Sequence, residues 1–469
     1  MSSRETLLVV AAVSAVVHLL AIGSLPLIVT PDGAEYIQAG IWMLDRGEIW
    51  PNPFRTPGYP ALLAWTFSLF GRNPTAILVV QHGLAWASTV LVTAIACRFA
   101  GALPALAAGL LFALDPWSLM LSTYALSETA VAFAVVVTSA VVLLRPGAGL
   151  RHAFLVGALL TTPCFVRPAL QAFAPFAGLA WVLRAATTPR TRAGLGAVVL
   201  AGFAITSAPW LLYNHSRGTD GFARGSSFTL WYGVTFSGLL DLDYPIDERT
   251  RASYEANAAR HLSDDSIMRT VVETDARNDA EQDRRLGDWA KASIRKRPLG
   301  YLKSAASALL WALNCGIEGK PPMYDELPFF ADRLGWDGRR IIGAPASNFQ
   351  GAGRFPGWES FASSQTGGGV LQQYLSWWGA RHVRGVPQVP LFLAALVACG
   401  ICVRDRQWPL LILFAGSLAL VAVHCALLMP VARYTITGWS LWYVALAIVL
   451  REVAARIWTD APALAIPPP

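Results

Sequence analysis

The sequence predicts an all-helical protein that crosses a membrane about 10–12 times. Hydrophobic residues make up 54% of the 469 residues and charged residues only 14%, whereas an ordinary soluble domain carries about 25% charged residues. The chain also contains 18 Trp and 12 Tyr, which are typical of helices that cross two lipid–water boundaries. Long uncharged runs recur along the sequence and alternate with arginines. These observations exclude a disordered chain and argue against a purely soluble protein.

Each predicted membrane helix is an uncharged run, because a helix needs about 20 apolar residues to span a bilayer. The first run, 6–31, is too long for a signal peptide and lacks its small-residue cleavage site. Arg4 precedes this run and favours a cytoplasmic N-terminus. The later runs that predict membrane helices are 75–97, 99–114, 129–144, 152–166, 168–183, 193–215, 385–403, 407–429 and 435–450.

Arginines mark alternate connections between these runs, which is typical of cytoplasmic turns. They are Arg98, Arg145, Arg151, Arg184, Arg190, Arg192, Arg404 and Arg406. The connections 30–74 and 115–128, and the turn at Arg167, then face outward. The net charge of +7 is therefore interpreted as basic cytoplasmic loops and not as a nucleic-acid binding surface.

This pattern divides the chain into four parts. Residues 1–213 form an N-terminal transmembrane module that includes the first outward loop. Residues 214–385 are more polar and form an extracytoplasmic loop region of mixed structure, in which 304–317 fits a re-entrant helix as well as a membrane span. Residues 386–450 form the last transmembrane helices, and residues 451–469 form a cytoplasmic tail.

The first outward loop begins with a carboxylate at the predicted end of a membrane helix. Asp32 is followed by Glu35 three residues later, and one interpretation is a helix N-cap with a capping box. The other interpretation is that Asp32 accepts a proton from a hydroxyl at the membrane boundary. Ile37, Ile41 and Leu44 recur at helical spacing and predict a helix that lies along the membrane surface.

A second motif of this loop, Arg-Thr-Pro-Gly-Tyr-Pro, begins at Arg55. One interpretation is a Pro-Gly turn before a helix, with an arginine that serves topology alone. The other is that the Arg55 guanidinium binds the phosphate of a lipid through two parallel hydrogen bonds.

Glu128 is an isolated charge at the start of a predicted apolar helix, with no other charged residue between Asp115 and Arg145. A carboxylate near membrane depth is costly and is therefore a functional candidate, although the N-terminal end of a helix also favours an acid. Arg167 and Arg433 are predicted to be outward cations, and either can pair with a carboxylate or a phosphate.

In this order the motifs resemble the GT-C superfamily of integral-membrane glycosyltransferases, in particular its protein O-mannosyltransferase and aminoarabinose transferase branches. The resemblance covers residues 1–210 well, 214–385 loosely, and 430–434 by one short motif. The motifs that carry it are Pro31-Asp32 with Tyr36, the segment that begins at Arg55, Thr123-Tyr124-Ala125-Leu126 with Glu128, and Arg433-Tyr434.

The resemblance implies a GT-C-like fold and an inverting glycosyltransferase with a polyprenyl-phosphate sugar as donor and a lipid, glycan or protein hydroxyl as acceptor. It implies that Asp32 is the general base, that Glu128 is a second catalytic carboxylate, and that Arg55 and Arg433 bind the donor phosphate. The expected location is a bacterial inner membrane, with the site facing outward. The further residues expected to contact substrate are Tyr36, Tyr59, Tyr124 and Arg167.

Two questions stay open at this point. Many relatives carry two adjacent acids in the first loop, whereas Gly33 follows Asp32 here, so the metal requirement is undecided and a divalent cation between Asp32 and Glu128 is one arrangement. The competing functional class is a secondary transporter or lipid flippase, which would show repeats and polar sites near the bilayer midplane. The lone acids at helix ends on one face favour surface chemistry instead.

Overall fold

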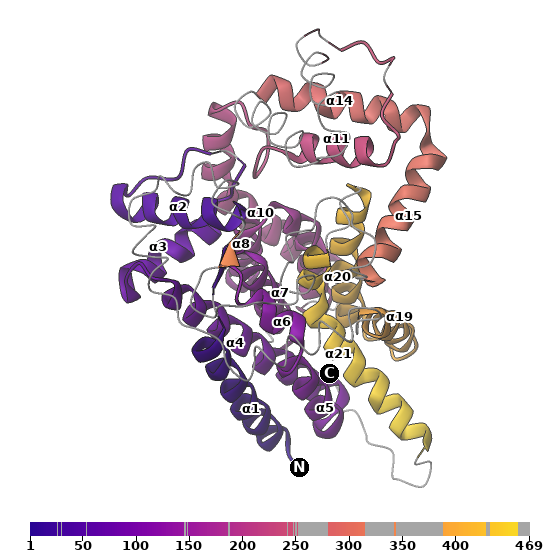
Figure 1. The fold of residues 1–469 in the computed structure, drawn as a ribbon. Coiled ribbons are helices and arrows are strands. Elements are labelled where there is room, and N and C mark those ends of the chain that lie inside the picture. Colours follow the sequence, from indigo (N-terminus) through magenta and orange to yellow (C-terminus); the bar gives the residue numbers. More distant parts are fainter. Residues whose placement is uncertain are drawn as a thin grey trace.

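Apolar helices of membrane length form the framework of the protein (Figure 1). The computed structural model describes residues 1–241 apart from 26, 30, 53, 145–146, 148 and 186–187, followed by 243–246, 248, 251, 280–314, 342–343, 388–427 and 432–457. Within these residues, four helices are long and apolar enough to cross a membrane: α1 (Ser3–Ser24), α4 (Pro74–Ala100), α10 (Pro189–Ser216) and α20 (Trp408–Ala426).

Shorter apolar helices complete the bundle, and the predicted helical membrane fold is confirmed. They are α5 (Ala102–Ala113), α7 (Glu128–Leu144), α8 (Leu150–Val166), α9 (Ala174–Ala185) after a 3-10 turn η1 (Pro168–Ala172), and α19 (Gln388–Arg404). The 26-residue helix α21 (Ala432–Ile457) belongs to the same bundle. Helix α4 packs against α1, α5, α7 and α21, so the two halves of the chain share one apolar core.

The first membrane helix is shorter than predicted, because α1 ends at Ser24 and not at residue 31. Leu25 adopts an extended conformation, as is usual for the residue before a proline. The chain then enters strand β1 (Ile28–Val29), which pairs in parallel with β2 (Ile342–Gly343). This two-residue ladder is a small departure from the all-helical prediction within the described part of the chain.

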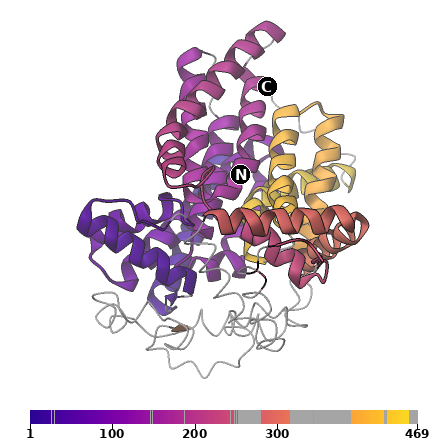
Figure 2. The ribbon, with the colours of Figure 1, turned by 90° about the horizontal axis from the view of Figure 1, so that it is seen from above.

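Helices α2 (Pro31–Arg46) and α3 (Gly58–Phe70) form a pair at one end of the bundle, called here the α2 end. In the view from above, this pair lies on one side and the C-terminal helices, in orange and yellow, lie on the other (Figure 2). The apolar stripe of α2 was predicted to lie against the membrane surface. In the structure it is buried inside the protein instead, since Ile37 is 0% exposed and Ile41 7%. Helix α3 covers it and instead exposes Trp65, Leu69 and Phe70.

A separate helical pair lies beyond the α2 end (Figure 1) and is called here the outer module. It consists of α11 (Ser226–Phe236) and α14 (Ala280–Lys296), which pack around a core of their own. Trp231 and Trp289 fill this core. Helix α15 (Pro298–Asn314) connects the module to the C-terminal helices, and the Tyr301 hydroxyl donates to the carbonyl of Ala426 at 2.6 Å.

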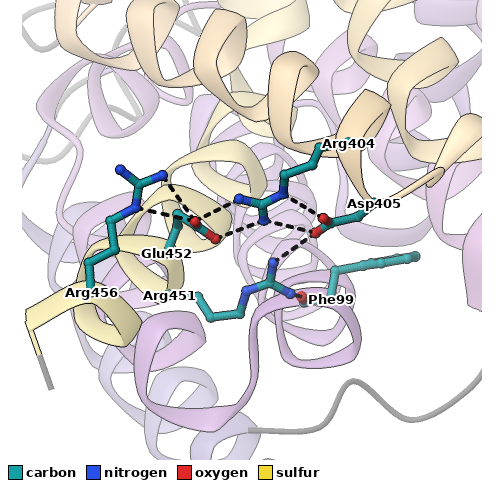
Figure 3. Close-up of polar contacts among 6 residues, drawn as sticks. All are labelled: Phe99, Arg404, Asp405, Arg451, Glu452 and Arg456. Atoms are coloured by element: carbon teal, nitrogen blue, oxygen red, sulfur yellow. Dashed lines mark hydrogen bonds and ion pairs between the residues drawn. The ribbon is translucent and has the colours of Figure 1, made fainter. Parts of the chain in front are cut away.

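The opposite end of the bundle, the α5 end, is held by an ion network (Figure 3). Arg404 at the end of α19 binds Glu452 of α21 through two hydrogen bonds of 2.7 and 2.9 Å. Arg451 donates to Asp405 at 3.3 Å and to the carbonyl of Phe99, near the end of α4, at 3.0 Å. Two of the arginines predicted at cytoplasmic turns, Arg98 and Arg404, therefore lie near the same end, away from α2.

Candidate functional site

A guanidinium held by two carboxylates is the most polar feature at the α2 end. Nη2 of Arg55 lies 2.6 Å from Oδ1 of Asp32, and Nε donates to Oε2 of Glu35 at 2.8 Å. The side chains are largely enclosed, with exposed fractions of 16% for Arg55, 20% for Asp32 and 28% for Glu35. We call these three residues the Arg55 cluster.

The start of α2 places both carboxylates of this cluster. The helix begins at Pro31, so Asp32 is its second residue, and residues three apart on a helix project from the same face. Asp32 therefore lies inside the first turn and is not the N-cap, and Glu35 binds Arg55. The N-cap interpretation of Asp32 is therefore wrong, because α2 begins one residue earlier, at Pro31, and Glu35 contacts an arginine twenty residues away.

One nitrogen of the Arg55 guanidinium has no partner within the described residues. Among the described residues, no hydrogen bond or ion pair involves its Nη1, and the guanidinium carbon lies 4.8 Å from the centre of the Tyr36 ring. Burial acts to lower the pKa of Arg55, but the charges of Asp32 and Glu35 outweigh it, so the pKa lies above its ordinary value. The guanidinium is therefore a fixed positive charge with two unused N–H donors, which suits an anionic ligand.

A second ion pair lies at the first residue of α7. Oε1 of Glu128 lies 3.0 Å from Nη1 of Arg167, which occupies the connection between α8 and η1. Glu128 is only 2% exposed. A carboxylate this deeply buried requires a partner, and the N-terminal end of α7 also favours a negative charge. We call these two residues the Glu128 pair.

A chain of polar and aromatic contacts joins the Arg55 cluster to the Glu128 pair. Tyr36 meets Tyr59 edge to face, with 4.9 Å between ring centres. The Tyr59 hydroxyl lies 3.3 Å from Oε1 of Gln81, whose Nε2 donates to the carbonyl of Tyr124 at 2.6 Å. Tyr124 precedes Glu128, the first residue of α7, by four residues. Burial, followed by the charge of Glu128, raises the pKa of Tyr59 well above its ordinary value, so this phenol stays protonated.

The backbone after Arg55 is also fixed against the residues just before Arg167. The Thr56 hydroxyl donates to the carbonyl of Val166 at 3.2 Å. A Cβ added to Gly58 would lie 2.6 Å from the carbonyl carbon and oxygen of Phe165, closer than real Cβ atoms approach, so only glycine fits at this position. The two arginines are therefore held close to each other by direct contacts of their own segments.

The structure brings together most of the residues predicted for the site. Asp32, Arg55, Glu128 and Arg167 lie in the two clusters. Tyr36, Tyr59 and Tyr124 lie in the chain of contacts between them. Arg433 belongs to the first turn of α21, and its side chain lies outside the described residues.

Sequence reasoning missed Glu35 and Gln81 as members of this site. Glu35 was explained by capping, although its spacing from Asp32 also places the two acids on one helix face. Gln81 carried a usable signal, since it is an uncharged polar residue inside a membrane-length apolar run. In the described part of the chain, no three His, Cys, Asp or Glu side chains are grouped to hold a metal ion.

The fold and these two clusters define a helical membrane protein with a buried, charged site at one end of its bundle. No family model matches the chain, and no curated protein sequence matches it. Two solved structures of ArnT from Cupriavidus metallidurans match, one bound to undecaprenyl phosphate and one in the apo state. Each has 13% sequence identity and a TM-score of 0.36, with 97% of this chain and 79% of that chain covered.

Proposed function

We propose that the protein transfers a monosaccharide from a polyprenyl-phosphate sugar to a hydroxyl acceptor, with inversion, at the outer face of a membrane. The observation that carries this proposal is the Arg55 cluster. It combines the Asp32 carboxylate with a guanidinium whose Nη1 has no hydrogen-bond partner in the described part of the chain, and both lie where a membrane bundle ends. The order of motifs along the chain, which resembles the GT-C superfamily, supports the same reaction class.

Arg55 would bind the donor phosphate through Nη1 while Glu35 keeps hold of its Nε edge. A guanidinium binds phosphate well because its N–H groups match two phosphate oxygens. The same contact stabilises the charge that grows on the phosphate as the sugar leaves. Arg433 remains a proposed second phosphate ligand on the basis of its sequence motif alone.

Asp32 would act as the general base. The acceptor oxygen attacks the anomeric carbon from the face opposite the phosphate, so a new C–O bond forms as the bond from that carbon to the phosphate oxygen breaks. Asp32 takes the hydroxyl proton, and the polyprenyl phosphate leaves as an anion beside Arg55. One displacement of this kind inverts the configuration at the anomeric carbon.

The Glu128 pair and the tyrosines would orient the substrates. Glu128 offers a carboxylate to sugar or acceptor hydroxyls, and Arg167 is its ion-pair partner in this buried position. Tyr36 and Tyr59 are buried edge to face between the two clusters, so their rings would contribute by holding the charged groups in place around the substrates. A lipid, a glycan and a protein hydroxyl remain equal candidates for the acceptor.

The test is transfer from a panel of radiolabelled polyprenyl-phosphate sugars in membranes that contain the protein. We expect one donor to give a labelled product covalently bound to an acceptor, and the Asp32→Asn variant to give none. If label crosses the membrane on its original lipid without forming a new product, the protein belongs to the transporter or flippase class instead.

A further inference from the structure

Phe54 lies between the Arg55 cluster and the outer module. A small turn fixes it, because the backbone N–H of Phe54 donates to Oδ1 of Asn52 at 3.0 Å and the N–H of Arg55 donates to the Asn52 carbonyl at 3.4 Å. The Phe54 ring packs against the core of α11 and α14. Two consecutive residues thus belong to two different units, with the ring in the outer module and the guanidinium in the site.

The outer module receives this ring at a glycine. Gly225 precedes α11 and has φ +102°, a left-handed conformation that favours glycine. A Cβ at this position would overlap the ring of Phe54. Helix α14 fixes the same end of α11, because a carboxylate oxygen of Asp283 accepts the backbone N–H of Phe228 at 2.9 Å. A continuous packed path therefore runs from α14 through the start of α11 and Phe54 to Arg55.

We propose that Phe54 is a positioning residue through which the outer module sets the position of Arg55, and hence its affinity for the donor phosphate. This inference rests on the proposed function. Arg55 follows Phe54 directly in the chain, so a shift of the ring displaces the guanidinium backbone. A displacement of about 1 Å at a reacting centre can reduce the rate about 100-fold. Ligands that rearrange α11 and α14 would then change donor binding without touching Arg55.

The experiment compares equilibrium binding of a polyprenyl phosphate to the detergent-solubilised full chain and its variants. Phe54→Ala and Gly225→Ala alter the same contact from opposite sides, and we expect each to weaken binding about 10-fold to 100-fold. Phe54→Leu retains most of the ring's volume and should restore much of the affinity. Leu239→Ala is the matched control, because Leu239 belongs to the same core but lies against Gly300 of α15. It should bind as the wild type does.

A double-mutant cycle separates positioning from a general loss of structure. If Phe54 acts through Arg55, the effect of Phe54→Ala should largely disappear in an Arg55→Lys background, since residues that act through one another are not additive. Additive effects, or equal weakening by Leu239→Ala, would overturn the inference. Equal binding by the wild type and Phe54→Ala would overturn this inference but leave the proposed function standing. No binding by the wild type would remove the proposed function and this inference with it.

Discussion

Arg55 and Asp32 must loosen their contact during the proposed reaction, and this step decides when Asp32 becomes a base. Nη2 of Arg55 lies 2.6 Å from Oδ1 of Asp32, so this carboxylate oxygen is engaged by the guanidinium and must be released before it can take a proton from the acceptor. A phosphate bound at Nη1 adds a third anion to one guanidinium, so the hold on Asp32 weakens. In the proposed reaction Asp32 would therefore become available to the acceptor hydroxyl only when the donor is in place, which would protect the donor from premature attack by water.

Replacement of Asp32 tests this role most directly. Asp32→Asn keeps an oxygen for the Arg55 hydrogen bond but cannot take a proton, so we expect transfer to fall about 100-fold to 10,000-fold while the protein stays folded. Initial rates with saturating donor and acceptor measure the effect. Glu35→Gln is the matched control, because Glu35 binds the same guanidinium. A larger loss in Glu35→Gln than in Asp32→Asn would assign the base to Glu35.

Replacement of Arg55 separates donor binding from acceptor binding. Arg55→Lys keeps the positive charge but loses the planar donor geometry, and Arg55→Ala loses both. We expect the KM for the donor to rise in the order wild type, Lys, Ala, with the acceptor KM nearly unchanged. Titration of each substrate at a fixed level of the other measures this. A raised acceptor KM with an unchanged donor KM would place Arg55 at the acceptor.

The pairing of α11 and α14 depends on a buried carboxylate that also titrates. Asp283 is 7% exposed, and burial raises its pKa above the ordinary value. The folded state therefore binds the proton of Asp283 more tightly than the unfolded chain. Protonated Asp283 therefore adds to the free energy of unfolding at low pH. This stabilising contribution is lost as the pH rises from the ordinary pKa of the carboxyl through its raised pKa in the folded state.

Substitutions at Asp283 should therefore act in two directions. Asp283→Asn keeps an oxygen for the N–H of Phe228 without the buried charge, so its melting temperature at neutral pH should equal or exceed that of the wild type. Asp283→Ala leaves this helix-terminal N–H without its acceptor and should lose about 0.5–2 kcal/mol. Thermal unfolding of the full chain across the acidic range measures both. A lower melting temperature for Asp283→Asn than for Asp283→Ala would contradict the argument.

Most helices could be predicted from the sequence, whereas the contacts between them could not. Uncharged runs located α4, α7, α8 and α20 because membrane length and apolar composition are local properties. The end of α1 was misplaced, because no charge marks the change of conformation at Leu25. Pairings such as Glu35 with Arg55 join segments far apart in the chain, and nothing in their spacing reveals which partners will meet.

The two ends of the bundle differ in their chemistry, and this predicts the orientation of the whole molecule. The α5 end carries the network of Arg404 and Glu452, while the α2 end carries the site and the outer module. Basic residues gather on the cytoplasmic side of membrane proteins, so the α2 end should face outward. Single cysteines at the exposed positions Glu48 and Asp288, in a background without native cysteines, should react with an impermeant reagent from outside.

Cysteines at exposed positions of the α5 end, Thr191 and Arg456, should react only after the membrane is opened. Opposite accessibility of Glu48 and Asp288 would separate the outer module from the site and contradict the packing of Phe54. Reversed accessibility of all four positions would leave the site intact but turn it toward the cytoplasm, where a different donor pool is present.

The Arg55 cluster and the Glu128 pair together contain three carboxylates and two guanidinium groups. We expect this excess of negative charge to select among the lipids of a bilayer. Anionic phospholipids greatly outnumber any sugar carrier, and a bare phosphate headgroup meets surplus negative charge here. A glycosyl phosphate also brings hydroxyls, which donate hydrogen bonds to those carboxylates. We therefore expect a polyprenyl-phosphate sugar to displace phosphatidic acid, whose headgroup is a bare phosphate, in competition binding to vesicles, and Glu35→Gln to narrow the difference in affinity between the two lipids. Equal competition by both lipids would show that abundance, and not charge, decides which headgroup occupies the site.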